Sequence, residues 1–209
     1  MSGSTKEGYN TKKVLEEMKL IQRVFDKHGV RLILVYGLLL GLYRDKKMLP
    51  DDDDVDYCVI DKIDLKTRKA IAHDLYDLGF MPQEILFNTF GKMEPIDPFY
   101  SGDEKTGIIV CQKYFKYTIF FFKEVYCDIH EKEYICIPKL GAYPLIAIPS
   151  KFFKKLGSIK FKSLKLLTPS PIKEYLAASY QDWKDKSLRD HSPLWTDVHK
   201  TNHEDIRDT

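Results

Sequence analysis

Apolar residues recur at helical spacing in two stretches of the chain, and capping residues mark a third. Within residues 11–28 the apolar side chains lie four, three and four positions apart, which predicts an amphipathic helix. Residues 64–78 have a similar spacing after the capping residue Asp64, so a second helix is expected there. Ser170 followed by Pro171 is typical of an N-cap and the first position of a third helix.

Short runs rich in β-branched and aromatic residues predict strands. The run 31–36 predicts a buried strand, after which Gly37 turns the chain into a short Leu-rich helix that ends at Arg44. Further strands are expected at 55–60, 83–90, 106–112, 114–122, 125–129 and 133–138, with a loop over 91–106 and a hairpin around Gly157. The pattern therefore predicts an α+β fold, in which one mixed sheet has helices packed on it.

The length of 209 residues suits one domain with short appendages. We expect a flexible tail over 1–9 and a single domain over 10–185 that ends in a helical element. Residues 186–209 are expected to form a polar tail that wraps the surface or is disordered. A hydrophobic content of 44% with 31% charged residues excludes a globally disordered chain and a mini-protein held by disulfides.

Basic and acidic residues nearly balance, but they are unevenly placed. The net charge of +2, from 33 basic and 31 acidic residues, gives no reason to expect a nucleic-acid partner. Six lysines lie within 151–165, which is typical of a solvated face; the alternative is a peripheral contact with a membrane or an anionic lipid-linked acceptor. Six of the eleven residues 51–61 are Asp, and this cluster is the candidate for chemistry.

The cysteines indicate a reducing compartment. None of them forms a C-x-x-C pair, and each lies in an apolar, strand-like run, so buried free thiols are expected. They are Cys58, Cys111, Cys127 and Cys136. The first residues lack the apolar core of a signal peptide, and no apolar run approaches the roughly 18 residues that span a bilayer. We therefore expect a cytoplasmic protein.

Two aspartates of the cluster have the spacing of a metal site. In a strand, Asp54 and Asp56 point to the same side while Val55 points into the core, and their Cβ atoms lie about 6.7 Å apart. Two such carboxylates repel each other unless a cation lies between them, and oxygen ligands favour Mg²⁺, Mn²⁺ or Ca²⁺. Asp52 has the same parity and is a further candidate ligand, whereas Asp53 is expected to be solvated or capping. The alternative is an acidic, solvated loop without a metal.

A third aspartate, Asp128, lies within the apolar run 125–129, where an unpaired carboxylate is costly. If its strand lies beside that of Asp54 and Asp56, at the usual spacing of about 4.8 Å, three carboxylates converge. Such a group is typical of phosphoryl transfer with two metal ions, or with one metal ion and a base.

The segment from Gly37 to Asp56 resembles the signature of the LicD family, Gly-x-Leu-Leu-Gly-x-x-Arg-x-Lys-x-x-x-Pro-x-Asp-Asp-Asp-x-Asp. Asp128-Ile129 and the later Tyr175-Leu176 and Tyr180-Gln-Asp-Trp183 resemble its other elements, in the same order. The family includes bacterial phosphocholine transferases and fukutin-like ribitol-phosphate transferases. The resemblance implies a nucleotidyltransferase-like mixed sheet flanked by helices.

The resemblance also implies a reaction and roles. A phospho-alcohol such as phosphocholine would move from a CDP-linked donor to a sugar hydroxyl of a surface glycan or a lipid-linked sugar, with Mg²⁺ or Mn²⁺ as cofactor. Asp54 and Asp56 would be metal ligands, and Asp128 a third ligand or the general base. Gly37 would let the backbone approach the donor phosphate, and Arg44 or Lys46 would contact phosphate oxygens. Arg44 has a simpler alternative, an ion pair with the acidic loop.

Departures from the family pattern leave alternatives open. At the donor-contacting position, Leu38 stands where the family has Thr or Ser; the other departures are Lys47, Asp51, His130 and Gln181. The alternatives are a nucleotidyltransferase that modifies a small hydroxyl compound, and a divalent-ion-binding domain without activity. His191 is a weak further site candidate, while His199 and His203 are expected to be surface histidines.

Overall fold

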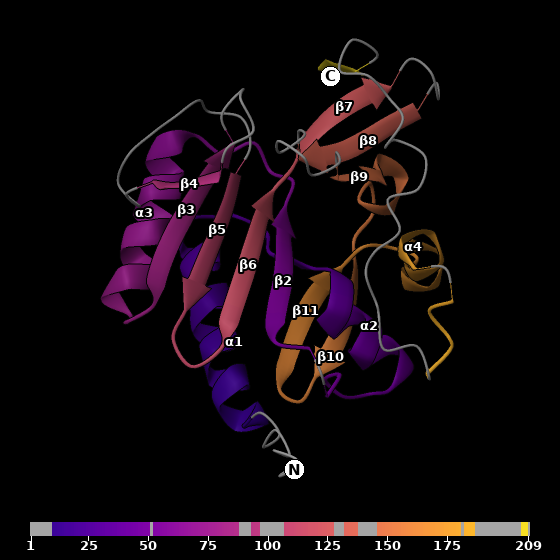
Figure 1. The fold of residues 1–209 in the computed structure, drawn as a ribbon, viewed down its shortest axis with the longest axis horizontal. Helices are drawn as coiled ribbons and strands as arrows, with labels where there is room; N and C mark the ends of the chain where they lie inside the picture. Colours follow the sequence, from indigo (N-terminus) through magenta and orange to yellow (C-terminus); the bar gives the residue numbers. More distant parts are fainter. Residues whose placement is uncertain are drawn as a thin grey trace, which may run out of the picture.

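The computed structural model describes residues 10–50, 52–87, 93–96, 107–127, 132–137, 146–180, 182–186 and 206–208. Its helices are α1 (Thr11–Lys27), α2 (Tyr36–Arg44), α3 (Leu65–Asp77) and α4 (Ile172–Ser179), with a 3-10 turn η1 (Ser150–Phe152). Figure 1 shows two sheets, a large one in the body of the molecule and a smaller one beside its upper end.

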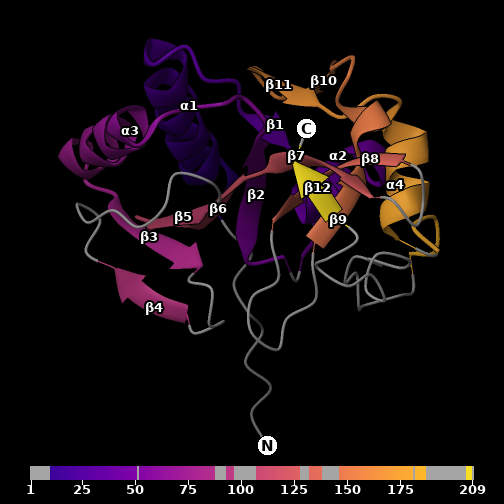
Figure 2. The same ribbon diagram turned by 90° about the horizontal axis from the view of Figure 1, so that it is seen from above.

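The large sheet is mixed, as the sequence predicted. Its eight strands are, in spatial order, β10 (Gly157–Phe161), β11 (Leu164–Thr168), β1 (Ile33–Leu34), β2 (Asp54–Val59), β6 (Lys116–Phe121), β5 (Gly107–Gln112), β3 (Met81–Phe87) and β4 (Met93–Ile96). β2 runs parallel to β6 and antiparallel to β1. Helices flank this sheet on both faces: α1 and α3 cover one, and α2 and α4 lie on the other (Figure 2). The α+β fold is therefore confirmed.

The small sheet contradicts the expectation of a single sheet. Its order is β12 (Ile206–Asp208), β7 (Lys123–Cys127), β8 (Lys132–Ile137) and β9 (Ile146–Pro149), with every pair antiparallel. One residue, Phe122, separates β6 from β7, and its N–H donates to the carbonyl of Val59 at the end of β2. Past that bond the chain continues from the large sheet into the small one (Figure 1).

Alternation along β2 assigns its side chains to the two faces of the large sheet. Val55 lies opposite Tyr117 of β6, whose hydroxyl donates to the Val14 carbonyl of α1 at 3.2 Å. Asp54 and Asp56 therefore point to the opposite face, which we call the α2 face. On that face the ring of Tyr36 from α2 meets the ring of Phe120 at a centroid distance of 5.6 Å.

The expected helices form, with one shift. Asn10 caps α1, and the Asp64 carboxylate caps α3 by accepting from the Thr67 N–H at 2.7 Å. The third helix starts one residue later than predicted, because Pro171 itself is the N-cap and no side chain caps α4.

Three strand predictions need correction. The run 31–36 forms a strand only at Ile33–Leu34, since Tyr36 already opens α2. The hairpin turns at residues 162–163 and not at Gly157, which begins β10. Within 91–106, where a loop was expected, Met93–Ile96 pairs with β3 despite containing Pro95, which an edge strand tolerates.

A buried carboxylate on α1 holds the start of β6 in place. The side chain of Glu17 is 6% exposed and accepts hydrogen bonds from the N–H groups of Tyr114 and Phe115, at 2.8 and 3.1 Å. It also accepts from the Tyr117 hydroxyl at 3.1 Å. Lys116 lies within this short segment, so Glu17 fixes the backbone from which Lys116 projects to the α2 face.

We predict that Glu17→Ala lowers the free energy of unfolding by about 2–5 kcal/mol, because one buried and one half-buried N–H group and a buried hydroxyl lose their acceptor. Chemical denaturation measures this change. Glu16→Ala is the matched control on the exposed side of the same helix and should change stability by less than about 0.5 kcal/mol. Equal effects of the two substitutions would contradict the clamping role.

Candidate active site

Two carboxylates lie on the α2 face at the start of β2, as the sequence predicted. Asp54 and Asp56 are partly exposed, whereas Val55 between them is fully buried. Their partners on β6 are Lys116 opposite Asp54 and Thr118 opposite Asp56. This part of the α2 face is therefore polar.

Lys116 is a cation that the sequence analysis missed. Its Nζ lies 2.8 Å from Asp54 Oδ2 and 3.8 Å from Asp53 Oδ1. Burial alone would lower the pKa of Lys116, but the hydrogen bond to Asp54 and the neighbouring aspartate charges raise it above its usual value. The parity of Lys116 and Thr118 was visible in the sequence, but the pairing of β6 with β2 was not.

Asp52 joins the cluster from the loop before β2. A Cβ atom on Gly37 would lie 2.5 Å from Asp52 Oδ2, so glycine is needed for this carboxylate to lie against the start of α2. The preceding residue, Tyr36, has a φ of 56°, a left-handed conformation that is uncommon for a bulky residue. The tight turn from β1 into α2 thus brings the first turn of the helix against Asp52.

Burial and mutual repulsion disfavour the charged forms of these acids. Burial, followed by the charges of Asp54 and Asp53, raises the pKa of Asp52 to about 7. Burial, followed by the charges of Asp54 and Asp52, raises the pKa of Asp56 well above its usual range. Lys116 opposes both shifts without cancelling them. With every aspartate ionised, the cluster would therefore have more negative charge than Lys116, the ammonium described beside it, balances.

A second missed residue, Tyr180, lies at the end of α4. Its side chain is 4% exposed, and burial together with the charges of Asp56, Asp52 and Asp54 raises the pKa of its phenol. That coupling places the phenol within electrostatic range of all three carboxylates. Tyr180 is part of the buried core, and α4 also brings it to the edge of the acidic cluster.

Arg44 points to a different set of partners. Its side chain is 6% exposed and its Nε and Nη2 donate to Asp45 Oδ2 at 3.0 and 2.8 Å. Its Nη1 donates to the carbonyls of Trp183 and Asp185, both at 3.2 Å. Among the described residues, the ion pair is thus with Asp45 and not with Asp52, Asp53 or Asp54. These bonds fasten residues 182–186 to the end of α2.

The other two expected donor contacts lie away from the carboxylates. Lys46 donates from Nζ to the Tyr43 carbonyl at 2.8 Å, and the side chain of Leu38 is 1% exposed. Leu38 therefore contributes to the core. Among the residues expected to contact the CDP-linked donor, Gly37 is therefore the one whose described contacts include the acidic cluster.

Asp128 lies outside the described residues, as do Asp51, His130, Gln181, His191, His199 and His203. The strand that precedes Asp128 is β7, which pairs with β8 and β12 in the small sheet. The neighbours of β2 are β1 and β6, so the sheet does not pair β7 with β2. The predicted role of Asp128 stays a prediction.

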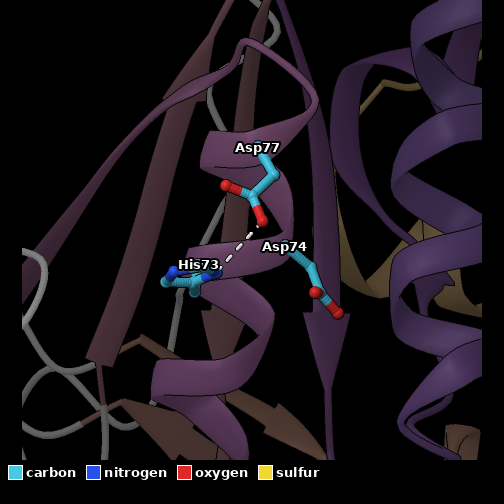
Figure 3. Close-up of side chains that lie close together, drawn as sticks. All are labelled: His73, Asp74 and Asp77. Carbon is cyan, nitrogen blue, oxygen red and sulfur yellow. Dashed lines mark ion pairs between the residues drawn. The ribbon is translucent and has the colours of Figure 1, made fainter.

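Another group of side chains has the spacing for a metal ion. In the described part of the chain, His73, Asp74 and Asp77 on α3 form the one group of at least three His, Cys or acidic residues whose ligand atoms lie within 4.8 Å of one another (Figure 3). Protein partners already occupy it: Asp74 Oδ2 lies 2.7 Å from both Lys27 Nζ and His28 Nε2. Asp77 Oδ2 lies 3.2 Å from His73 Nδ1.

The residues of the α2-face cluster suit a hard divalent ion. Asp54 and Asp56 offer carboxylate oxygens on one side of one strand, and Gly37 leaves the space that the Asp52 carboxylate fills. The raised pKa values of Asp52 and Asp56 show that a further cation would be favourable there. Of the helices described, none has both the length and the hydrophobicity to cross a membrane.

We predict that Asp52→Asn stabilises the protein in the presence of a chelator, increasingly so from pH 4 to pH 7. The unfolded state loses the Asp52 proton near pH 3.8 and the folded state near pH 7, so ionisation destabilises the native protein over that interval. Above pH 7 the variant should be more stable by about 1–4 kcal/mol. Denaturation at several pH values measures the difference. Asp53→Asn, at a 74% exposed side chain, is the control and should show no such trend.

We predict that Arg44→Ala lowers the free energy of unfolding by about 2–4 kcal/mol, since Asp45 loses its guanidinium partner and keeps the ion pair with Lys186, and since residues 182–186 lose two hydrogen bonds. The exposed neighbour Lys47→Ala should change it by less than about 0.5 kcal/mol. Calorimetric titration with CDP in the presence of Mn²⁺ completes the test. The Arg44→Ala variant should bind CDP with the affinity of the unaltered protein. Weakened CDP binding at unchanged stability would instead support a phosphate contact.

Comparison with known proteins assigns the chain to a family. Residues 29–171 match the family described as the LicD/FKTN/FKRP nucleotidyltransferase domain. No curated protein matches the chain. One similar solved structure is a Thermotoga maritima protein provisionally named a nucleotidyltransferase. It has a TM-score of 0.44 and 14% identity, and the match covers 83% of this chain and 87% of that chain. That likeness is too low to carry an argument.

The family match spans more than half of the chain and agrees with the motif from Gly37 to Asp56, so the protein belongs to the LicD/FKTN/FKRP family of transferases.

Proposed function

We propose that the protein transfers a phospho-alcohol, such as phosphocholine, from a CDP-linked donor to a sugar hydroxyl, with Mg²⁺ or Mn²⁺ at Asp54 and Asp56. The observation that carries this proposal is the crowding of Asp52, Asp54 and Asp56 on the α2 face beside the start of α2. The acceptor would be a surface glycan or a lipid-linked sugar, as in the family.

The proposed chemistry needs three tasks from the chain. Asp54 and Asp56 would hold the divalent ion, with Asp52 as a further ligand. That ion would supply charge neutralisation at the phosphates. Gly37, in the first turn of α2, would let backbone N–H groups approach the donor phosphate. Asp128 would take the proton of the entering hydroxyl as its oxygen bonds to phosphorus and CMP leaves.

A cytoplasmic location is proposed from the cysteines. Cys58 and Cys111 are buried free thiols, and burial raises the pKa of both. Such thiols are typical of proteins from reducing compartments. A peripheral contact of the lysines within 151–165 with a membrane or lipid-linked acceptor remains a proposal.

Thermal-shift measurements with CDP-alcohols, in the presence and absence of Mg²⁺, test the donor assignment. A ligand at a hundred times its dissociation constant adds about 2.7 kcal/mol of stability, which such measurements resolve. Mass spectrometry of the product then separates the proposed reaction from nucleotidyl transfer, because the former adds a phospho-alcohol and the latter a nucleoside monophosphate. Nucleotide addition would overturn the proposed reaction within the same fold.

We predict that the double substitution Asp54→Asn with Asp56→Asn abolishes Mn²⁺ binding and turnover while the fold is retained. Two like charges are removed from a crowded patch, so stability should stay constant or increase. Calorimetric titration with Mn²⁺ measures the binding. Asp53→Asn removes one charge from the exposed side of the loop and should retain most of the affinity. Undiminished Mn²⁺ binding by the double variant would refute the assignment of the metal site.

A further inference from the structure

The ammonium of Lys116 links the start of β6 to the acidic cluster at the start of β2. It projects from the first residue of β6 and lies within 4.0 Å of both Asp53 and Asp54. Register places it beside Asp54, since the two residues are direct partners of the parallel β2–β6 pair. Lys116 is therefore built into the cluster by the sheet itself and does not reach it from a distant loop.

A divalent ion and this ammonium would compete for the same carboxylate. Lys116 Nζ lies at a hydrogen-bond distance of 2.8 Å from Asp54 Oδ2. An ion bound to Asp54 and Asp56 would have two positive charges within a few ångströms of that ammonium, and like charges at such distances repel. Metal binding should therefore weaken the ion pair between Lys116 and Asp54.

Lys116 is free to move when the ion pair weakens. Its side chain is 39% exposed, and a lysine ammonium is a compact charge on a flexible four-carbon stem. Arg44 differs in this respect, because its guanidinium is 6% exposed and bonded to Asp45 and two carbonyls. Of the two cations, Lys116 is the one that can reach an anion above the acidic cluster.

We propose that Lys116 is a binding residue for the donor phosphate, and that it exchanges the Asp54 carboxylate for that phosphate when the divalent ion binds. In the metal-free protein the ammonium neutralises part of the cluster. In the loaded site it supplies the positive charge that lets an anionic donor approach four aspartates. This inference rests on the proposed function and extends it to a residue outside the family signature from Gly37 to Asp56.

Calorimetric titrations of Lys116→Met with Mn²⁺ alone, and with CDP in the presence of Mn²⁺, test the exchange. Removal of the competing ammonium should tighten Mn²⁺ binding by about three- to tenfold, as expected for a partly exposed ion pair. Loss of the charged hydrogen bond to phosphate should weaken CDP binding by about ten- to a hundredfold. Because the two effects have opposite signs, general damage to the site would not reproduce them.

Two further variants complete the experiment. Lys12→Met removes the same unit charge from an exposed position on α1 and should leave both affinities unchanged. Lys116→Arg keeps a cation at the site and should restore most of the CDP affinity. If Lys116→Met weakens Mn²⁺ binding, or leaves CDP binding unchanged, the inference is wrong while the proposed function stands. If the unaltered protein binds neither Mn²⁺ nor CDP, both are wrong.

Discussion

The repulsion among the aspartates at the start of β2 is the constraint on which the arrangement of the site depends. Burial and the charges of the neighbouring aspartates raise the pKa of Asp52 to about 7 and that of Asp56 well above its usual range. A cluster of this kind disfavours the folded state unless a cation reaches it. Asp54 meets Lys116 in the sheet, and Asp52 fits against α2 only because residue 37 is glycine.

The opposite face of the large sheet supplies the rigidity that this crowding requires. Glu17 of α1 binds the two N–H groups and the hydroxyl around Lys116, so the register of β6 against β2 is held from the far side. Burial of Val55 and Tyr57 on that face fixes which way Asp54 and Asp56 point. A one-residue slip would carry both carboxylates into the core, so the apolar positions of β2 also determine its polar ones.

The sequence predicted correctly those features of the fold and the site that depend on residues close together in the chain. The cap Asp64 and the alternation of Asp54, Val55 and Asp56 each depend on a few neighbouring residues, and both were confirmed. The position of Lys116 depends on which strand pairs with β2 and in which register, and no short segment encodes that. The place of β7 in a second sheet likewise depends on strand pairing, because β7 pairs with β8 and β12 and not with the strands of the large sheet.

The strained start of α2 links the fold to the acidic cluster. Tyr36 has a left-handed φ of 56°, and this backbone conformation costs energy for a residue with a side chain. Its side chain is buried, with 5% exposed. Its ring packs on Phe120, two residues beyond Thr118 on the same face of β6, and this burial helps to hold the unusual backbone in place. The next residue, Gly37, then has Asp52 where a Cβ would otherwise lie. A relaxed backbone at Tyr36 would redirect the first turn of α2, so the packing of one aromatic pair keeps the helix start and the carboxylates together.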